Sequence, residues 1–177
     1  MKALAVIGLK KTFRFLCGEA IRFVFCVTIL PPIRVALLRL LGAKVGKNVV
    51  IHRFEFINYY RGSFANISIG DECFIGNGVL FDLADTIVLE RQVTISERVV
   101  LMTHLNVGYM DHPLQASFPS THKGVHIRRG CFIGVNATIL QGVDIGSLTL
   151  VAAGAVVTKS LPGNVVCAGV PAKVIRA

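Results

Sequence analysis

The chain has 177 residues, enough for a single compact domain, and 53% of them are hydrophobic, so it can bury a sizeable core. The net charge of +9 is uneven, because residues 1–44 hold eight basic residues and one acidic residue and so contribute +7. The remainder is almost neutral and carries no nucleic-acid-binding motif, which argues against a nucleic-acid partner. The five cysteines show no CxxC spacing, which predicts free, buried thiols in a reducing compartment.

The N-terminal segment, residues 1–41, is predicted to be helical. Residues 3–16 have the pattern of an amphipathic helix, and an apolar run and the Pro31-Pro32 pair precede a second short helix. Only eleven residues separate Arg22 from Arg34, too few for a membrane-spanning helix of about 20 apolar residues. A signal peptide also fits poorly, because no cleavage site of small residues follows the apolar run. Two interpretations stay open, a segment lying in the membrane interface and a helical cap over the end of a solenoid.

The next part of the chain repeats every six residues. In steps of six, fourteen of the sixteen positions in the runs Val45–Val99 and Ile127–Val157 are Ile or Val. This period fits neither a helix nor an ordinary strand, but it suits a solenoid of very short strands around one core. Small residues recur two positions before an aliphatic one: Cys73, Thr103, Cys131, Ala137, Thr149 and Ala155. Glycines follow several aliphatic positions, where we expect tight corners: Gly46, Gly70, Gly76, Gly134 and Gly146. We therefore predict an all-β solenoid domain over residues 42–177.

One stretch interrupts the period, because the interval from Val99 to Ile127 is not a multiple of six. Residues 105–124 are polar and rich in turn-forming residues, and a long loop on a regular scaffold usually carries function. Four of the five histidines lie in this loop or beside it: His104, His112, His122 and His126. His104 ends the string VVLMTH where the loop departs, and it is a candidate general base because imidazole titrates near neutral pH. From the residue alone, a polar anchor for the loop is the other interpretation.

Several strings resemble the hexapeptide-repeat acyltransferases, and in particular the maltose, galactoside and polysaccharide O-acetyltransferases. The resemblance covers residues 45–177 and is carried by IGDECFIGNGVLFD, VVLMTH, IRRGCFIGVNATILQGVDIG and VAAGAVVTKSLPGNVVCAGVPAKVIRA. It implies a left-handed parallel β-helix, acetyl-coenzyme A (acetyl-CoA) as acetyl donor, and a homotrimer with the cofactor groove between subunits. The left hand comes from the resemblance alone, since parallel β connections are normally right-handed.

The resemblance also implies roles for single residues near the loop. His104 matches the catalytic histidine, and His112 is the competing candidate for the base. Asp82 and Asn77 match acceptor-binding positions, although Asp82 could equally be a turn residue that bonds its own backbone. The group that orients His104 stays open between Asp82, Asp111 and a backbone carbonyl.

Residues that match the acetyl-CoA site fall into two groups. Small residues would let the pantetheine arm lie along backbone amides: Gly134, Val135, Ala152 and Ala153. The second group is Thr158, Lys159, Lys173 and Arg176, whose three cations suit the phosphates of the cofactor. The last two lie in the C-terminal tail, residues 163–177, where a solvated basic tail is the alternative. No metal is expected.

We therefore expect an acetyl-CoA-dependent O-acetyltransferase that modifies a sugar hydroxyl of a surface polysaccharide or its lipid-linked precursor. It would be cytoplasmic and peripheral on the inner face of the cytoplasmic membrane through residues 1–41. N-acetylation of an amino sugar, or acetylation of another small hydroxyl compound, is the alternative. A metal enzyme like the carbonic anhydrases needs three convergent histidines, and the histidine spacing does not resemble that family. A non-catalytic interaction module is the third class.

Overall fold

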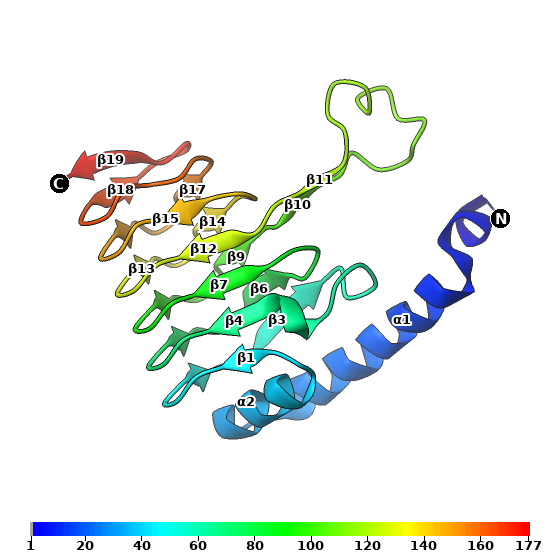
Figure 1. The fold of residues 1–177 in the computed structure, drawn as a ribbon, viewed down its shortest axis with the longest axis horizontal. Coiled ribbons are helices and arrows are strands. Elements are labelled where there is room, and N and C mark those ends of the chain that lie inside the picture. The colour runs from blue at the N-terminus through cyan, green and yellow to red at the C-terminus, as the bar shows by residue number, and fades with distance from the viewer. Residues whose placement is uncertain (1) are drawn as a thin grey trace.

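The computed structural model describes residues 2–177, with side chains from residue 11 onward. Its body is a three-sided solenoid of short strands, with two helices at one end and a long loop projecting from one edge (Figure 1). The strands of successive turns, which we call coils, stack in parallel in three sheets. This architecture is the predicted left-handed parallel β-helix.

Each coil contributes strands to the sheets in the order A, B, C. Sheet A consists of β1 (Lys44–Val45), β4 (Ile67–Ile69), β7 (Ile87–Leu89), β12 (Val125–Ile127) and β15 (Asp144–Ile145). Sheet B consists of β2 (Val50–Ile51), β5 (Phe74–Ile75), β8 (Thr94–Ile95), β13 (Phe132–Ile133), β16 (Leu150–Val151), β18 (Val166–Ala168) and the antiparallel β19 (Lys173–Arg176). Sheet C consists of β3 (Phe54–Ile57), β6 (Val79–Asp82), β9 (Val100–Leu101), β14 (Thr138–Ile139) and β17 (Val156–Val157). The neck of the loop is an antiparallel ribbon of β10 (His104–Leu105) and β11 (Thr121–His122). We call the connections between sheets the B–C corner and the C–A corner.

The pairing register shows that residues are inserted in three coils, not only at the long loop. In the regular coils each residue pairs with the one three repeats later, as Ile127 does with Ile145. Leu89 instead pairs with Ile127, and the excess over three repeats equals the predicted loop in length. Two earlier coils are also longer than three repeats, because Val45 pairs with Ile69 and Ile69 pairs with Leu89. The prediction of a single interruption was therefore wrong.

These differences in coil length shift the six-residue frame. The first B–C corner is shorter than the next one, so Ile57 is only partly buried and lies outside the core. Ser63 caps the short 3-10 turn of residues 64–66 instead of filling the interior. In the coil that follows β6, three aliphatic residues of the six-residue series are buried at the positions where other coils have small residues: Ile87, Val93 and Val99. The main inward positions of that coil are two residues later: Leu89, Ile95 and Leu101. The six small residues named from the sequence are all buried, as predicted.

The glycines after the aliphatic positions have a different cause from the expected one. Their φ angles lie outside the left-handed region. Instead, a Cβ on Gly70 would lie 2.6 Å from the backbone nitrogen of Arg91 in the next coil. Only glycine, which has no Cβ, fits in this space. Left-handed backbone occurs later in each corner, mostly at residues that are not glycine, including Glu72, Gln92 and Asn136. Close stacking of coils, not the turn itself, therefore requires these glycines.

The N-terminal segment forms two helices, α1 (Lys2–Val27) and α2 (Pro31–Leu40). The first helix extends well past residue 16, through the apolar run, and the two prolines begin the second helix where their missing N–H groups cost nothing. Phe25 of α1 is buried against Phe54 and Phe64, with ring centroids 4.8 and 5.8 Å away. Both helices thus pack on the first coil (Figure 1).

Four arginines of these helices bond the backbone carbonyls on the open edge of the first coil. Arg39 donates to Val45 O and Gly46 O at 3.0 and 2.5 Å, and Arg22 donates to Phe56 O at 2.9 Å. The other two are Arg34, which donates to Ile51 O, and Arg14, which donates to Tyr59 O and Gly62 O. Arg34 also donates to Thr28 O between the two helices. An uncovered sheet edge leaves carbonyls unpaired and invites aggregation. Part of the basic charge of the N-terminal segment therefore has a structural task, as the cap interpretation predicted.

Arg34 provides a test of this capping, because it is buried and donates to Ile51 at 3.3 Å. Arg34→Met keeps apolar volume but leaves that carbonyl without its donor, so the free energy of unfolding should fall by about 1–3 kcal/mol. Urea denaturation measures the change. Lys47→Ala, which removes the same charge from an exposed side chain of the first coil, should change it by less than about 0.5 kcal/mol. Equal effects of the two substitutions would contradict the capping role.

Candidate active site

A histidine and an aspartate meet at the neck of the loop. His104 begins β10, and its side chain is 18% exposed. Its Nδ1 lies 2.5 Å from Oδ2 of Asp82, which ends β6 and is fully buried. The two residues meet because β6 and β9 are neighbours in sheet C and the chain leaves both at the C–A corner. Of the three groups considered for orienting His104, Asp82 is the one in contact, whereas Asp111 is exposed in the loop.

Both oxygens of the Asp82 carboxylate accept hydrogen bonds. The backbone N–H groups of Thr103 and Ala84 donate at 2.8 and 3.2 Å, and Nδ2 of Asn58 donates at 2.7 Å. Burial by itself raises the pKa of Asp82, but the hydrogen bonds from Asn58, His104 and the two N–H groups outweigh burial and leave the pKa below its ordinary value. An ionised carboxylate requires a proton on the facing Nδ1 of His104. The lone pair of Nε2 is then free to accept a proton, as a general base requires.

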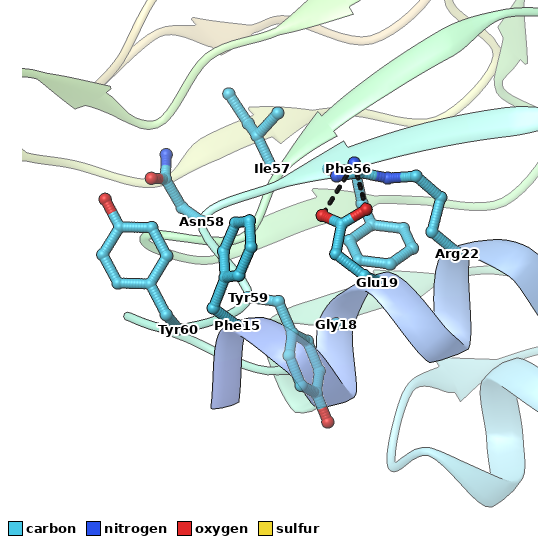
Figure 2. Close-up of a pocket in the computed structure, with 9 residues that line it drawn as sticks. All are labelled: Phe15, Gly18, Glu19, Arg22, Phe56, Ile57, Asn58, Tyr59 and Tyr60. Atoms are coloured by element: carbon cyan, nitrogen blue, oxygen red, sulfur yellow. Dashed lines mark hydrogen bonds and ion pairs between the residues drawn. The ribbon is translucent and has the colours of Figure 1, made fainter. Parts of the chain in front are cut away.

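Asn58 is a residue of this site that the sequence did not indicate. It follows β3 in the first coil, and its Nδ2 lies 3.2 Å from Nδ1 of His104. Its φ of 60° is left-handed, a region that asparagine tolerates better than most residues. It also lines a cavity of about 330 Å³ between α1 and residues 56–60, together with the rings of Phe15 and Tyr60 (Figure 2). The N-terminal helix and the Asp82–His104 pair are therefore linked through one residue.

Comparison with known proteins identifies the family. A family profile described as bacterial transferase hexapeptide (six repeats) matches residues 124–159, and a profile described as hexapeptide repeat of succinyl-transferase matches residues 66–82. The acetyltransferase WcaF of Escherichia coli K12, named for colanic acid biosynthesis, is 38% identical over 143 residues, which cover 81% of this chain and 74% of WcaF. The chain belongs to the hexapeptide-repeat acetyltransferases.

Two further similarities agree with this assignment. Galactoside O-acetyltransferase of Escherichia coli K12 is 36% identical over 152 residues, covering 81% of this chain and 68% of that protein. The solved structure of the hexapeptide-repeat acetyltransferase VCA0836 of Vibrio cholerae O1 biovar eltor, complexed with acetyl-CoA, matches with a TM-score of 0.77. Its sequence identity is 26%, and the match covers 90% of this chain and 84% of VCA0836. The predicted family, fold and enzyme class are thus confirmed.

The small residues predicted to contact the cofactor come together in this acetyltransferase. Gly134 and Val135 lie at the B–C corner, next to Ala152 and Ala153 of the following coil. A Cβ on Gly134 would lie 2.6 Å from the backbone nitrogen of Ala153, so only glycine lets the two coils approach this closely. The four residues form one narrow edge with little side-chain bulk.

The remaining predicted residues lie elsewhere. Thr158 and Lys159 are exposed at the C–A corner after β17, and Lys173 and Arg176 are exposed at the two ends of β19. Asn77 is exposed at the B–C corner, where its Oδ1 accepts a hydrogen bond from the backbone nitrogen of Arg53 at 3.3 Å. Asn77 is therefore separated from Asp82 by the length of strand β6.

The competing base and the metal hypothesis find no support in the described side chains. His112 lies within the loop, where its Nδ1 accepts a hydrogen bond from the backbone nitrogen of Leu114 at 3.1 Å. Among residues 11–177, no three side chains of His, Cys, Asp or Glu are grouped closely enough to hold a metal ion. Among the described side chains, the Asp82–His104 pair is thus the strongest candidate for acid–base catalysis, because its carboxylate is buried and fully hydrogen-bonded.

Removing the hydrogen bond from Asn58 to Asp82 should change how the free energy of unfolding depends on pH. A carboxyl group whose pKa is lowered by folding stabilises the protein above its unfolded pKa, and this contribution is lost as the pH falls through the folded pKa. Asn58→Gly removes a bond that lowers the pKa while still tolerating the left-handed backbone. The variant should be less stable at pH 7 by about 1.5–3 kcal/mol, and the difference should shrink below about pH 4.

Urea denaturation between pH 3 and pH 7 measures this difference. Asn66→Ala is the matched control, because Asn66 Nδ2 donates to the neutral carbonyl of Leu83 in the same corner at 2.9 Å. Its cost should not vary with pH. If the Asn58→Gly variant also shows a constant cost, Asn58 does not stabilise the charged form of Asp82.

Proposed function

We propose that this protein is an acetyl-CoA-dependent O-acetyltransferase that uses His104 as general base to acetylate a sugar hydroxyl. The observation that carries the proposal is the contact of 2.5 Å between His104 Nδ1 and the buried carboxylate of Asp82. This contact leaves Nε2 as the proton acceptor at the neck of the loop. A sugar hydroxyl is a poor nucleophile at neutral pH and needs such a base.

The proposed reaction is a direct transfer. Nε2 of His104 takes the hydroxyl proton while the sugar oxygen forms a bond to the thioester carbonyl carbon. The carbon–sulfur bond then breaks, the acetyl ester is released, and the imidazolium returns its proton to the sulfur of coenzyme A. Asp82 stabilises the transient imidazolium, and because both its oxygens are already bonded, we place it behind His104 and not against the acceptor.

The base assignment is tested by replacing each of two loop histidines. His104→Ala should lower the rate of acetyl transfer by about 10²–10⁴-fold, the usual contribution of a general base, and leave acetyl-CoA binding almost unchanged. His112→Ala is the control and should retain most activity. A coupled assay that detects the free thiol of coenzyme A measures both. Loss of activity only in His112→Ala would refute the assignment of His104.

Acetyl-CoA is the proposed donor because VCA0836 was solved with acetyl-CoA and shares this fold. The edge formed by Gly134, Val135, Ala152 and Ala153 supports an extended arm lying against backbone. The exposed cationic side chains of Lys159, Lys173 and Arg176 are the proposed ligands of the cofactor phosphates. They lie on different parts of one subunit, so a single cofactor molecule would meet all of them only in a groove shared by two subunits.

A homotrimer is supported by the character of the outer faces. Sheet B turns apolar side chains outward, and Val50, Phe132 and Leu150 are each about 40% exposed. Sheet A instead carries His126 and Asp144 on its outer face. We therefore propose that sheet B and the B–C corner face neighbouring copies of the chain, while sheet A faces water.

The phosphate contacts are tested by charge removal. Replacing Lys159 and Lys173 together with Ala should weaken coenzyme A binding by about tenfold for each phosphate that is left without its cation. The effect should be larger at low salt, because salt screens such interactions. Calorimetry measures affinity, and the double variant Lys44→Ala with Lys47→Ala controls for net charge. Unchanged affinity of the Lys159 and Lys173 variant would reject both residues as phosphate ligands.

The proposed acceptor is a sugar of a surface polysaccharide or of its lipid-linked precursor. The similarity to WcaF and to galactoside O-acetyltransferase supports a sugar. The N-terminal helix supports a membrane-bound acceptor, because α1 lies beside the corner that holds the Asp82–His104 pair. Arg14 of α1 bonds the carbonyls of Tyr59 and Gly62 in that corner. A sugar presented at the membrane surface would thus meet the site from the side of α1.

Membrane attachment is proposed because α1 and α2 keep an uncovered apolar face although they cap the solenoid. Exposed apolar side chains recur along α1 at helical spacing: Phe13, Leu16, Phe23, Val24 and Val27. Between the helices lies an apolar groove of about 230 Å³ that includes Val24 and Leu40. No helix within residues 2–177 is long and apolar enough to cross a membrane. We propose that this face lies on the inner surface of the cytoplasmic membrane.

Two exposed phenylalanines test the membrane hypothesis without removing the cap. Phe13 and Phe23 are 68% and 69% exposed, so replacing both with Glu should leave the melting temperature almost unchanged. The unaltered protein should co-sediment with anionic vesicles, and the variant should remain in the supernatant. Tyr109 and Met110 of the loop are similarly exposed and, replaced with Glu, provide the control. Failure of the unaltered protein to sediment would disprove the hypothesis.

A further inference from the structure

A second histidine–aspartate pair lies beside the first. His122 in β11 is the register partner of His104 in β10. Side chains of directly opposed residues in an antiparallel ribbon lie on the same face, with Cβ atoms about 4.5–5.5 Å apart. The Nδ1 atom of His122 lies 3.4 Å from Oδ2 of Asp85, three residues after Asp82. Both imidazoles therefore face the same corner, and each has a carboxylate at Nδ1.

The two pairs are joined through Thr103, which is fully buried. Its hydroxyl donates to the backbone carbonyl of Asp82 at 2.9 Å and accepts from the backbone nitrogen of Asp85 at 3.0 Å. The Asp85 carboxylate is itself oriented, because its Oδ1 accepts from the backbone nitrogen of Thr86 at 2.6 Å. The corner thus holds both carboxylates at defined positions below the ribbon.

The pairs differ in depth. The His104 side chain is mostly covered, whereas that of His122 is 68% exposed and that of Asp85 is 29% exposed. An exposed pair of this kind contributes little to stability. His122 is therefore available to a ligand at the rim of the site, and its Nε2 faces away from the carboxylate that lies near Nδ1.

We propose that His122 is an acceptor-binding residue whose Nε2 hydrogen-bonds a second hydroxyl of the sugar, next to the hydroxyl that His104 deprotonates. This inference rests on the proposed function. Two imidazoles on adjacent strands, each with a carboxylate within 3.4 Å of Nδ1, match two neighbouring hydroxyls on one sugar ring. The substrate class is then a sugar with two adjacent free hydroxyls at the position of transfer, and His122 determines that preference.

The experiment compares sugars with and without the second hydroxyl. Methyl glycosides of galactose, glucose and mannose, with their monodeoxy analogues, serve as acceptors for the unaltered enzyme and His122→Ala. The rate of acetyl transfer to each sugar gives kcat/KM. The rate of acetyl-CoA hydrolysis without sugar depends only on the base and the donor site. Asp85→Asn tests the support of His122. His126→Ala is the control, because His126 pairs with Glu90 at 3.0 Å on the outer face of sheet A, outside the corner that holds the two pairs.

His122→Ala should lower kcat/KM about tenfold on the best sugar, the effect of removing one hydrogen bond, and leave hydrolysis unchanged. For the unaltered enzyme, one monodeoxy analogue of that sugar should show the same tenfold reduction in kcat/KM. On this analogue, His122→Ala should not lower kcat/KM further. Asp85→Asn should give a smaller reduction of the same kind, and His126→Ala none.

Two outcomes overturn the inference while the proposed function stands. One is an equal fall of transfer and hydrolysis in His122→Ala, and the other is a cost of the substitution that persists on every monodeoxy analogue. Absence of transfer by the unaltered enzyme to all the sugars, with normal acetyl-CoA binding, instead overturns the proposed function, and the inference falls with it.

Discussion

The hydrogen bonds between stacked coils constrain everything else in this molecule. Strands of two to four residues cannot be stable alone, so each coil depends on the next coil to pair its N–H and carbonyl groups. Additional residues can then leave the wall only at corners, where no ladder is broken. All three insertions, including the loop of residues 105–124, lie at the C–A corner. Glycines such as Gly70 serve the same constraint, because a Cβ there would collide with the neighbouring coil.

Stacking at that corner assembles the candidate active site from three successive coils. Asn58, Asp82 and His104 follow β3, β6 and β9, which are neighbours in sheet C. A buried carboxylate is costly unless its oxygens are bonded, and here the corner backbone and Asn58 supply the donors. The electrostatic consequence is a carboxylate that stays charged and fixes the proton of His104 on Nδ1. The regular scaffold thus fixes the positions of these three side chains more rigidly than a single loop could.

The same constraint explains the N-terminal helices. The first coil has no coil beneath it, and arginines such as Arg22 and Arg34 bond the carbonyls that would otherwise be unpaired. Helix α1 does this while keeping Phe13 and Phe23 exposed on its other side. Capping and membrane attachment are therefore compatible, because they use opposite faces of one helix. Because α1 also lines the cavity with Asn58, the helix that carries the proposed membrane face lies next to the Asp82–His104 pair.

The sequence by itself determined the solenoid, the position of the long loop and the small residues of the wall, because each depends on a local period of six. The string VVLMTH likewise placed His104 at the loop. Only the tertiary structure decided that Asp82 orients His104, that Asn58 belongs to the site, and that His122 lies beside His104. The reason is physical: contacts between coils depend on the lengths of corner insertions and on the register of the ribbon. Corners and loops lie outside the core, so the residues inserted there have no periodic pattern that would show which of them meet.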